Sequence, residues 1–102
     1  MTDAGTSRFR LDTGTPATLA VTGELSFDTA TEALQAIQSA LSDARIKRLD
    51  LARVTRSDSA GLACVLAVVA AASQRGHALE VESMPAGMRA LAQVCEVDRL
   101  IG

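Results

Sequence analysis

An uncharged run of thirteen apolar or glycine residues, Ala60 to Ala72, constrains this chain more than any other feature. The nearest charged residues are Asp58 before it and Arg75 after it. A helix that crosses a membrane needs about 20 apolar residues, so this run is too short to span a bilayer. It therefore predicts a helix of a globular domain, from about Ser59 to Gln74, with apolar residues on every side.

The two sides of this helix predict different surroundings. One side presents a stripe typical of a sheet-facing surface, made of Leu62, Val65, Leu66 and Val69. The opposite side carries small apolar residues, namely Ala63, Cys64, Ala67, Ala70 and Ala71. Two interpretations remain open: neighbouring helices crowd over these residues, or the small-residue side stays exposed as a docking site for another protein.

The rest of the chain predicts an α/β domain. Strands are expected at residues 9–11, 17–21, 48–54 and 79–82, and helices at 29–41, at 59–74 and from 83 or 85 onward. Thr29-Ala30-Thr31-Glu32 has the pattern of a capping box, and Gly76 that of a left-handed helix end. The predicted fold is a four-stranded mixed sheet with an N-terminal hairpin and parallel crossovers, in the order β-β-α-β-α-β-α. About three helices are expected to cover at least one face.

The length of 102 residues predicts one domain with one compact core. We expect residues 1–7 to be disordered and residues 8–102 to form a single domain. The N-terminus lacks the basic and then apolar pattern of a secretory signal, which predicts a cytoplasmic protein. Cys64 and Cys95 lie in apolar stretches without a CxxC partner, so buried free thiols are expected rather than a disulfide.

Composition excludes several function classes. With a net charge of −2, the chain lacks the basic face that binding to duplex DNA requires. Its two aromatic residues are too few for a platform on which the bases of single strands could stack. One histidine and two distant cysteines rule out most metal sites, and no cofactor is expected. His77, in the turn after the long helix, would lie roughly 20 Å or more from Ser59 at the helical rise, too far for nucleophilic catalysis. We therefore expect no enzyme activity.

The turn that precedes the long helix is the candidate binding site. In parallel α/β units, ligands meet the protein beyond the carboxyl ends of the strands, where Ser57 and Asp58 are expected. Ser59 would lie in the first helical turn, beside unpaired backbone N–H groups that favour a phosphate. Gly61 would leave room for close approach, and Arg56 is placed to pair with an acidic group on a partner. The alternative is that Asp58 or Ser59 only caps the helix.

Three short segments carry a resemblance to a known family. Gly23-Glu24-Leu25, Leu49-Asp50-Leu51 and Ser57–Leu62, in this order of elements, resemble a STAS domain (sulphate transporter and anti-sigma factor antagonist) from residue 9 to 101. In the anti-sigma factor antagonists of that family, a partner kinase phosphorylates the hydroxyl residue that follows the Asp, which is Ser59 here. This resemblance implies an antagonist that is switched by phosphorylation of Ser59.

The MlaB branch of the same family is the better match. This chain resembles it in residues 56–63, in the apolar long helix, in Pro85-x-x-Met88-x-x-Leu91-Ala92 and in Val97-Asp98-x-Leu100. The antagonists, by contrast, commonly carry Asp directly after Gly-Glu-Leu, where this chain has Ser26, and Asp28 comes only two residues later.

The MlaB resemblance implies an adaptor. Members of that branch are small cytoplasmic subunits of bacterial ABC systems that move phospholipids and maintain outer-membrane lipid asymmetry, and they bind the transporter's ATPase through this turn and helix. We expect a non-catalytic subunit of an MlaFEDB-like system, peripheral to the inner membrane through its partner. The expected partner-binding residues are Arg56, Ser57, Asp58, Ser59, Ala60, Gly61, Ala63, Ala67, Ala70 and Ala71.

Overall fold

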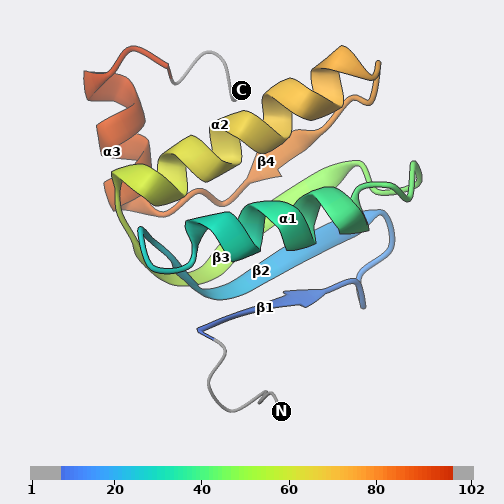
Figure 1. Cartoon of the computed structure of the whole chain (residues 1–102), viewed down its shortest axis with the longest axis horizontal. Coiled ribbons are helices and arrows are strands. Elements are labelled where there is room, and N and C mark those ends of the chain that lie inside the picture. Colours follow the sequence, from blue (N-terminus) through green and yellow to red (C-terminus); the bar gives the residue numbers. More distant parts are fainter. Residues whose placement is uncertain (1–7, 98–102) are drawn as a thin grey trace.

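The computed structural model describes residues 8–97, in which helices α1 and α2 pack side by side against one face of a sheet (Figure 1). The elements are β1 (Phe9–Asp12), β2 (Thr18–Leu25), α1 (Ala30–Ala40), β3 (Arg48–Ser57), α2 (Ser59–Gln74), β4 (Glu80–Glu82) and α3 (Ala86–Val94). This order confirms the predicted β-β-α-β-α-β-α arrangement. The disorder expected for residues 1–7 and the motif residues Asp98 and Leu100 lie outside the described residues.

The strands form one mixed sheet in the order β1-β2-β3-β4. β1 is antiparallel to β2, whereas β2, β3 and β4 run parallel to one another. Leu19 pairs with Leu49, which in turn pairs with Val81, so the apolar residues of adjacent strands form rows on one face. Because β2 and β3 are parallel, the loops that follow them leave the sheet at the same end.

The core lies between this face and the helices. Its fully buried large side chains include Leu19, Val21, Leu25, Ile37, Leu41, Leu49, Leu51, Val65, Val68 and Met88. Along the strands, the buried residues alternate with polar residues that point to the other face of the sheet. On that face Arg48 and Glu82 form an ion pair at 3.5 Å. This polar alternation lets a largely parallel sheet carry helices on one face and contact water with the other.

Both central strands are longer than predicted, because β2 continues to Leu25 and β3 to Ser57. Gly23 has a φ of +104°, and the pairing with β3 shifts register between Gly23 and Glu24. A Cβ at Gly23 would overlap the carbonyl oxygen of Arg8, the residue before β1. The irregularity interrupts the alternation of apolar and polar residues on which strand prediction depends.

The prediction of a capping box at the start of α1 is wrong, because the hydrogen bonds of a capping box are not formed. Thr29 is the N-cap residue, but its side chain makes no bond to the helix. Its Oγ1 instead accepts from the backbone N–H of Ser26 at 3.0 Å and donates to the carbonyl of Glu24 at 2.9 Å. Thr29 therefore closes the loop between β2 and α1 rather than capping the helix.

The bounds and both ends of α2 agree with the prediction. Asp58 is the N-cap, and Gly76, with a φ of +72°, follows the C-cap. The N–H groups of Gly76 and His77 donate to the carbonyls of Ser73 and Ala72, which satisfies the last turn. None of the helices in residues 8–97 has the length and apolar character that crossing a membrane would require.

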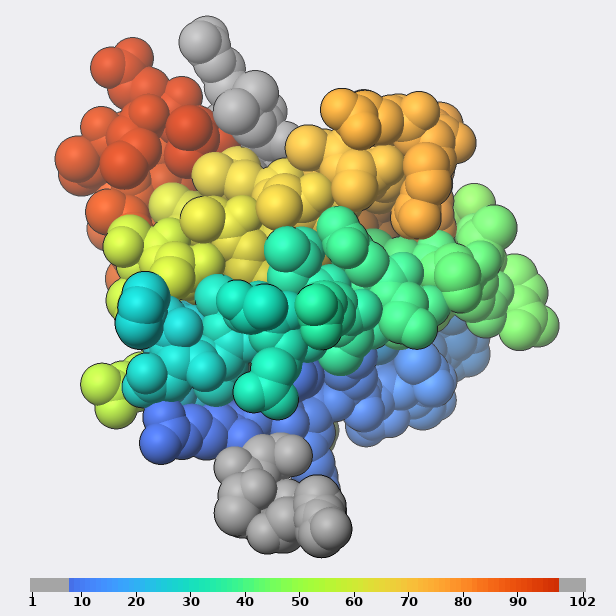
Figure 2. All heavy atoms as spheres, in the orientation of Figure 1, coloured from blue at the N-terminus to red at the C-terminus, as the bar shows by residue number. Residues whose placement is uncertain are grey.

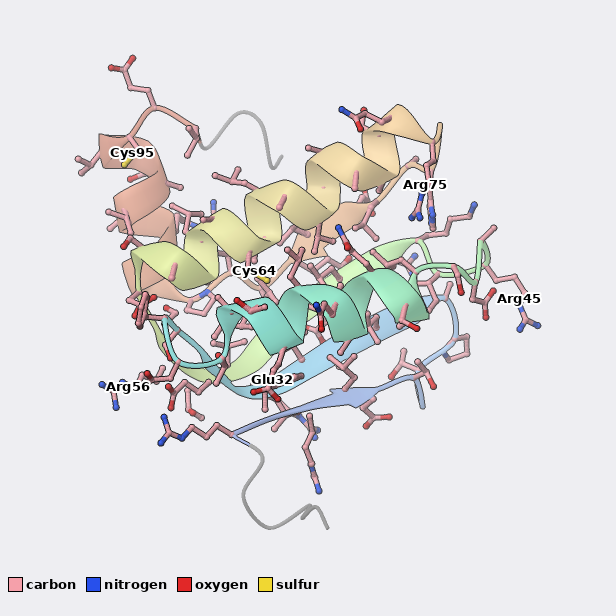
Figure 3. All side chains as sticks on the ribbon, viewed as in Figure 1. Glu32, Arg45, Arg56, Cys64, Arg75 and Cys95 are labelled. Atoms are coloured by element: carbon pink, nitrogen blue, oxygen red, sulfur yellow. The ribbon has the colours of Figure 1, made fainter. Side chains whose placement is uncertain are left out.

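The two cysteines occupy different environments. Both thiols are free, as expected, but only Cys64 is buried, whereas Cys95 is exposed at the end of α3. Burial raises the pKa of the Cys64 thiol to about 11. Cys64 lies between α2 and α1 (Figure 3), so its expected place on the outer side of α2 is wrong.

Gly61 sets how closely α2 approaches the sheet. The residue is buried, and an added Cβ would overlap the carbonyl oxygen of Leu25 at the end of β2. The expectation that Gly61 leaves room for the close approach of a phosphate is wrong, because the backbone of β2 in the same chain fills the space where its side chain would be.

We expect Gly61→Ala to lower the free energy of unfolding by about 2 kcal/mol or more, because backbone atoms of β2 must move to admit the methyl group. Urea unfolding of the purified protein measures this change.

Gly87→Ala is the matched control. Gly87 is exposed in α3, and an added Cβ meets nothing within 4 Å, so the substitution should raise the free energy of unfolding by about 0.5 kcal/mol through helix propensity. Equal effects of the two substitutions would contradict the close contact at Gly61.

Candidate functional site

The turn between β3 and α2 is organised by the carboxylate of Asp58. Its Oδ1 accepts from the N–H of Ala60 at 2.9 Å and from that of Gly61 at 3.1 Å, which caps the helix. Its Oδ2 accepts from the backbone N–H of Phe27 at 3.0 Å, in the loop between β2 and α1. One side chain therefore joins two segments that lie 31 residues apart in the sequence.

These hydrogen bonds favour the ionised form of Asp58. The N–H of Phe27 is the largest cause, those of Gly61 and Ala60 and the charge of Arg56 add to it, and together they outweigh desolvation. They hold the pKa of the Asp58 carboxyl below its ordinary value.

Ser59 is the first residue of α2 and is exposed. As the first helical residue it lies at the positive end of the helix dipole, where a negative charge is favoured. Arg56 is exposed and extends away from the body of the protein (Figure 3), whereas Ser57 is half-buried. The turn thus presents a hydroxyl, a carboxylate and a guanidinium group.

The outer side of α2 remains largely uncovered. Ala63, Ala67 and Ala70 are exposed at successive turns, while Ala60 and Ala71 are half-buried. α1 packs along one side of α2 and α3 packs against the other, and the surface between them is open in Figure 2. Within residues 8–97, neighbouring helices therefore do not crowd over these three alanines. We call Ser59, Ala63, Ala67 and Ala70 the α2 ridge.

The loop between β2 and α1 forms the adjoining part of this surface. The hydroxyl of Ser26, a buried residue, donates a short hydrogen bond to the carboxylate of Glu24. Arg8 pairs with Asp28 at 3.0 Å and lies 3.8 Å from Glu24. Ser26, at the position where antagonists commonly carry Asp, therefore makes its hydrogen bonds to other residues of the loop.

Phe27 is the residue that sequence reasoning missed. Its side chain is 82% exposed, although its backbone is held by Asp58. The one available signal was its place in a polar loop of a chain with only two aromatic residues. Nothing in the residue type says whether an aromatic ring packs inward, as Phe9 does, or outward.

His77 lies far from the turn, as predicted. Sixteen residues of α2 separate the two ends, which is about 24 Å of helix. The ring nitrogen Nε2 of His77 forms a hydrogen bond of 2.5 Å with the carbonyl oxygen of Ile46. No three His, Cys, Asp or Glu side chains gather as a metal site in the described part of the chain.

Comparison with known proteins agrees with this architecture. A family model described as "Mlab, STAS domain" matches residues 9–102. The chain belongs to this STAS family. STAS domains are generally non-catalytic. A search of curated protein sequences gives no match.

Two solved structures show the same fold as this STAS chain. One is the anti-sigma factor antagonist SpoIIAA in its unphosphorylated form, with a TM-score of 0.67 and 18% identity over 90% of this chain and 84% of that one. The other is the Bacillus cell fate determinant SpoIIAA in its phosphorylated form, with a TM-score of 0.64 and 19% identity over 90% and 86%. At this identity the likeness concerns the fold, and it confirms the predicted STAS architecture.

The lowered pKa of Asp58 predicts an acid-sensitive contribution to stability. A carboxyl whose folded pKa is depressed stabilises the protein fully above its unfolded pKa, near 3.8, and loses this contribution as the pH falls through the folded value. Wild type should exceed Asp58→Asn in free energy of unfolding at pH 7, and the difference should shrink below about pH 4. Urea unfolding across this range measures it, and a constant difference would contradict the assignment.

Proposed function

We propose that this chain is a non-catalytic adaptor that binds and supports the ATPase subunit of an MlaFEDB-like ABC transporter, which moves phospholipids and maintains outer-membrane lipid asymmetry. The observation that carries the proposal is the uncovered α2 ridge in a chain that the MlaB-type family model matches over residues 9–102. The adaptor would act in the cytoplasm, at the inner membrane, through its partner.

The composition of the ridge suits protein binding. Alanine side chains lose almost no conformational entropy when a partner covers them, and their small size lets a partner helix approach closely. Ser59 and Asp58 add polar groups at one end, and Arg56 adds a charge that an acidic residue on the ATPase would pair with. Ser57, Ala60 and Ala71 would form the half-buried border of the contact.

The mechanism requires no chemistry from the adaptor. If it binds the assembled or active conformation of the ATPase more tightly than the other, it raises the population of that conformation. The size of the effect equals the difference between the two binding free energies.

The test is Ser59→Arg, which places a long charged side chain at the exposed end of the ridge. We expect it to abolish copurification with the transporter's ATPase, coexpressed from the same organism, and to leave the midpoint of thermal unfolding within a few degrees of wild type. Copurification that survives the substitution would refute the site.

The matched control is Ser42→Arg, at an exposed serine just beyond α1, at the end of the molecule away from the turn. It introduces the same side chain and charge. Copurification should remain at the wild-type level.

A second candidate is an anti-sigma factor antagonist that binds an anti-sigma factor kinase and is switched by phosphorylation of Ser59. The exposed hydroxyl at the α2 N-terminus and the fold shared with SpoIIAA favour it. The intact mass of the protein purified from its native cells separates the two: an added phosphate that Ser59→Ala abolishes supports the antagonist, and an unmodified mass supports the adaptor.

A further inference from the structure

We propose that Phe27 is the apolar anchor of the partner-binding surface and that Asp58 is the positioning residue that holds it beside the α2 ridge. This inference rests on the proposed adaptor function and extends its surface onto the loop between β2 and α1. The partner feature it requires is an apolar pocket on the ATPase that admits one aromatic ring.

The exposure of Phe27 is the first reason. One of only two aromatic rings in the chain is 82% exposed, whereas Phe9 packs against the core. Aromatic residues are enriched at protein interfaces, and a few of them carry most of the binding free energy. Phe27 is also next to the ridge, because its N–H is bonded to the side chain that caps α2.

The second reason is that the backbone is held at Phe27 itself and at the residue before it. Asp58 Oδ2 binds the N–H of Phe27 at 3.0 Å. The preceding residue, Ser26, donates its N–H to Thr29 Oγ1 at 3.0 Å and its hydroxyl to Glu24. An exposed ring on a fixed backbone is preorganised, so binding orders fewer groups and proceeds with less loss of entropy.

The charges around Phe27 indicate what surrounds the pocket. Asp58 forms no ion pair within residues 8–97, although Arg56 lies near enough to lower its pKa. Asp28, next to Phe27, is paired with Arg8. A basic group at the rim of the pocket would complement the remaining negative charge of Asp58.

The first experiment compares Phe27→Ala with Val94→Ala by titration against the purified ATPase subunit. Val94 is 79% exposed, at the end of α3 and across α2 from α1, so both variants shorten an exposed apolar side chain. We expect Phe27→Ala to weaken binding about tenfold or more, and Val94→Ala to change it less than about twofold. Neither variant should shift the thermal unfolding midpoint by more than a few degrees.

The second experiment separates the two roles of Asp58. In Asp58→Asn the amide oxygen still accepts from Ala60 and Gly61, because Asn caps helices as well as Asp, but the amide nitrogen cannot accept from Phe27. Hydrogen exchange of the free protein should show faster exchange at the Phe27 amide and unchanged protection at Ala60 and Gly61. This readout needs no partner.

Binding then tests whether Asp58 acts through Phe27. We expect Asp58→Asn to weaken binding, and the loss in the double variant with Phe27→Ala to be smaller than the sum of the two single losses, because only the charge contact of Asp58 with the partner is independent of the ring. Additive losses would overturn the positioning role of Asp58. Wild-type binding by Phe27→Ala, with binding still abolished in Ser59→Arg, would overturn the anchor and leave the adaptor function standing; binding by Ser59→Arg would overturn the adaptor function itself.

Discussion

The structure depends on the close contact between Gly61 and the carbonyl of Leu25, where the first turn of α2 meets the end of β2. No side chain separates the two backbones, so the helix N-terminus is fixed directly on the parallel strands. The turn before α2 and the loop after β2 leave the same end of the sheet, and Asp58 can therefore bond to both. The close contact between Gly61 and Leu25 therefore determines how the surface at that end of the sheet is arranged.

The uncovered side of α2 has an equally simple origin. Two helices flank α2, and its large side chains, such as Leu62, Val65 and Val68, point into the core. Leu66 and Val69 are half-buried, and the residues left exposed along the middle of the helix are alanines, which any helix tolerates and which water contacts at little free-energy cost. A helix with apolar residues on all sides is thus accommodated in a two-layer domain without a third layer.

The sequence predicted the elements where one physical signal dominates and failed where contacts from elsewhere decide. The apolar run, Asp58 and Gly76 defined α2 correctly, since caps and hydrophobicity are local. Thr29 was misjudged because its hydroxyl had a competing partner in the preceding loop. Cys64 was placed on the wrong side because helical spacing does not tell where α1 packs, and the outward ring of Phe27 has no local signal.

Because Asp58 shares its two oxygens between segments distant in sequence, the arrangement of Phe27, Asp58 and the α2 ridge that we propose for partner binding exists only in the folded chain. A nascent or damaged molecule would have the same residues without their arrangement. Any protein that recognises this surface would discriminate by conformation as well as by sequence, and each binding event would withdraw folded molecules from the unfolding equilibrium. Binding by such a partner would therefore also select folded molecules over unfolded ones.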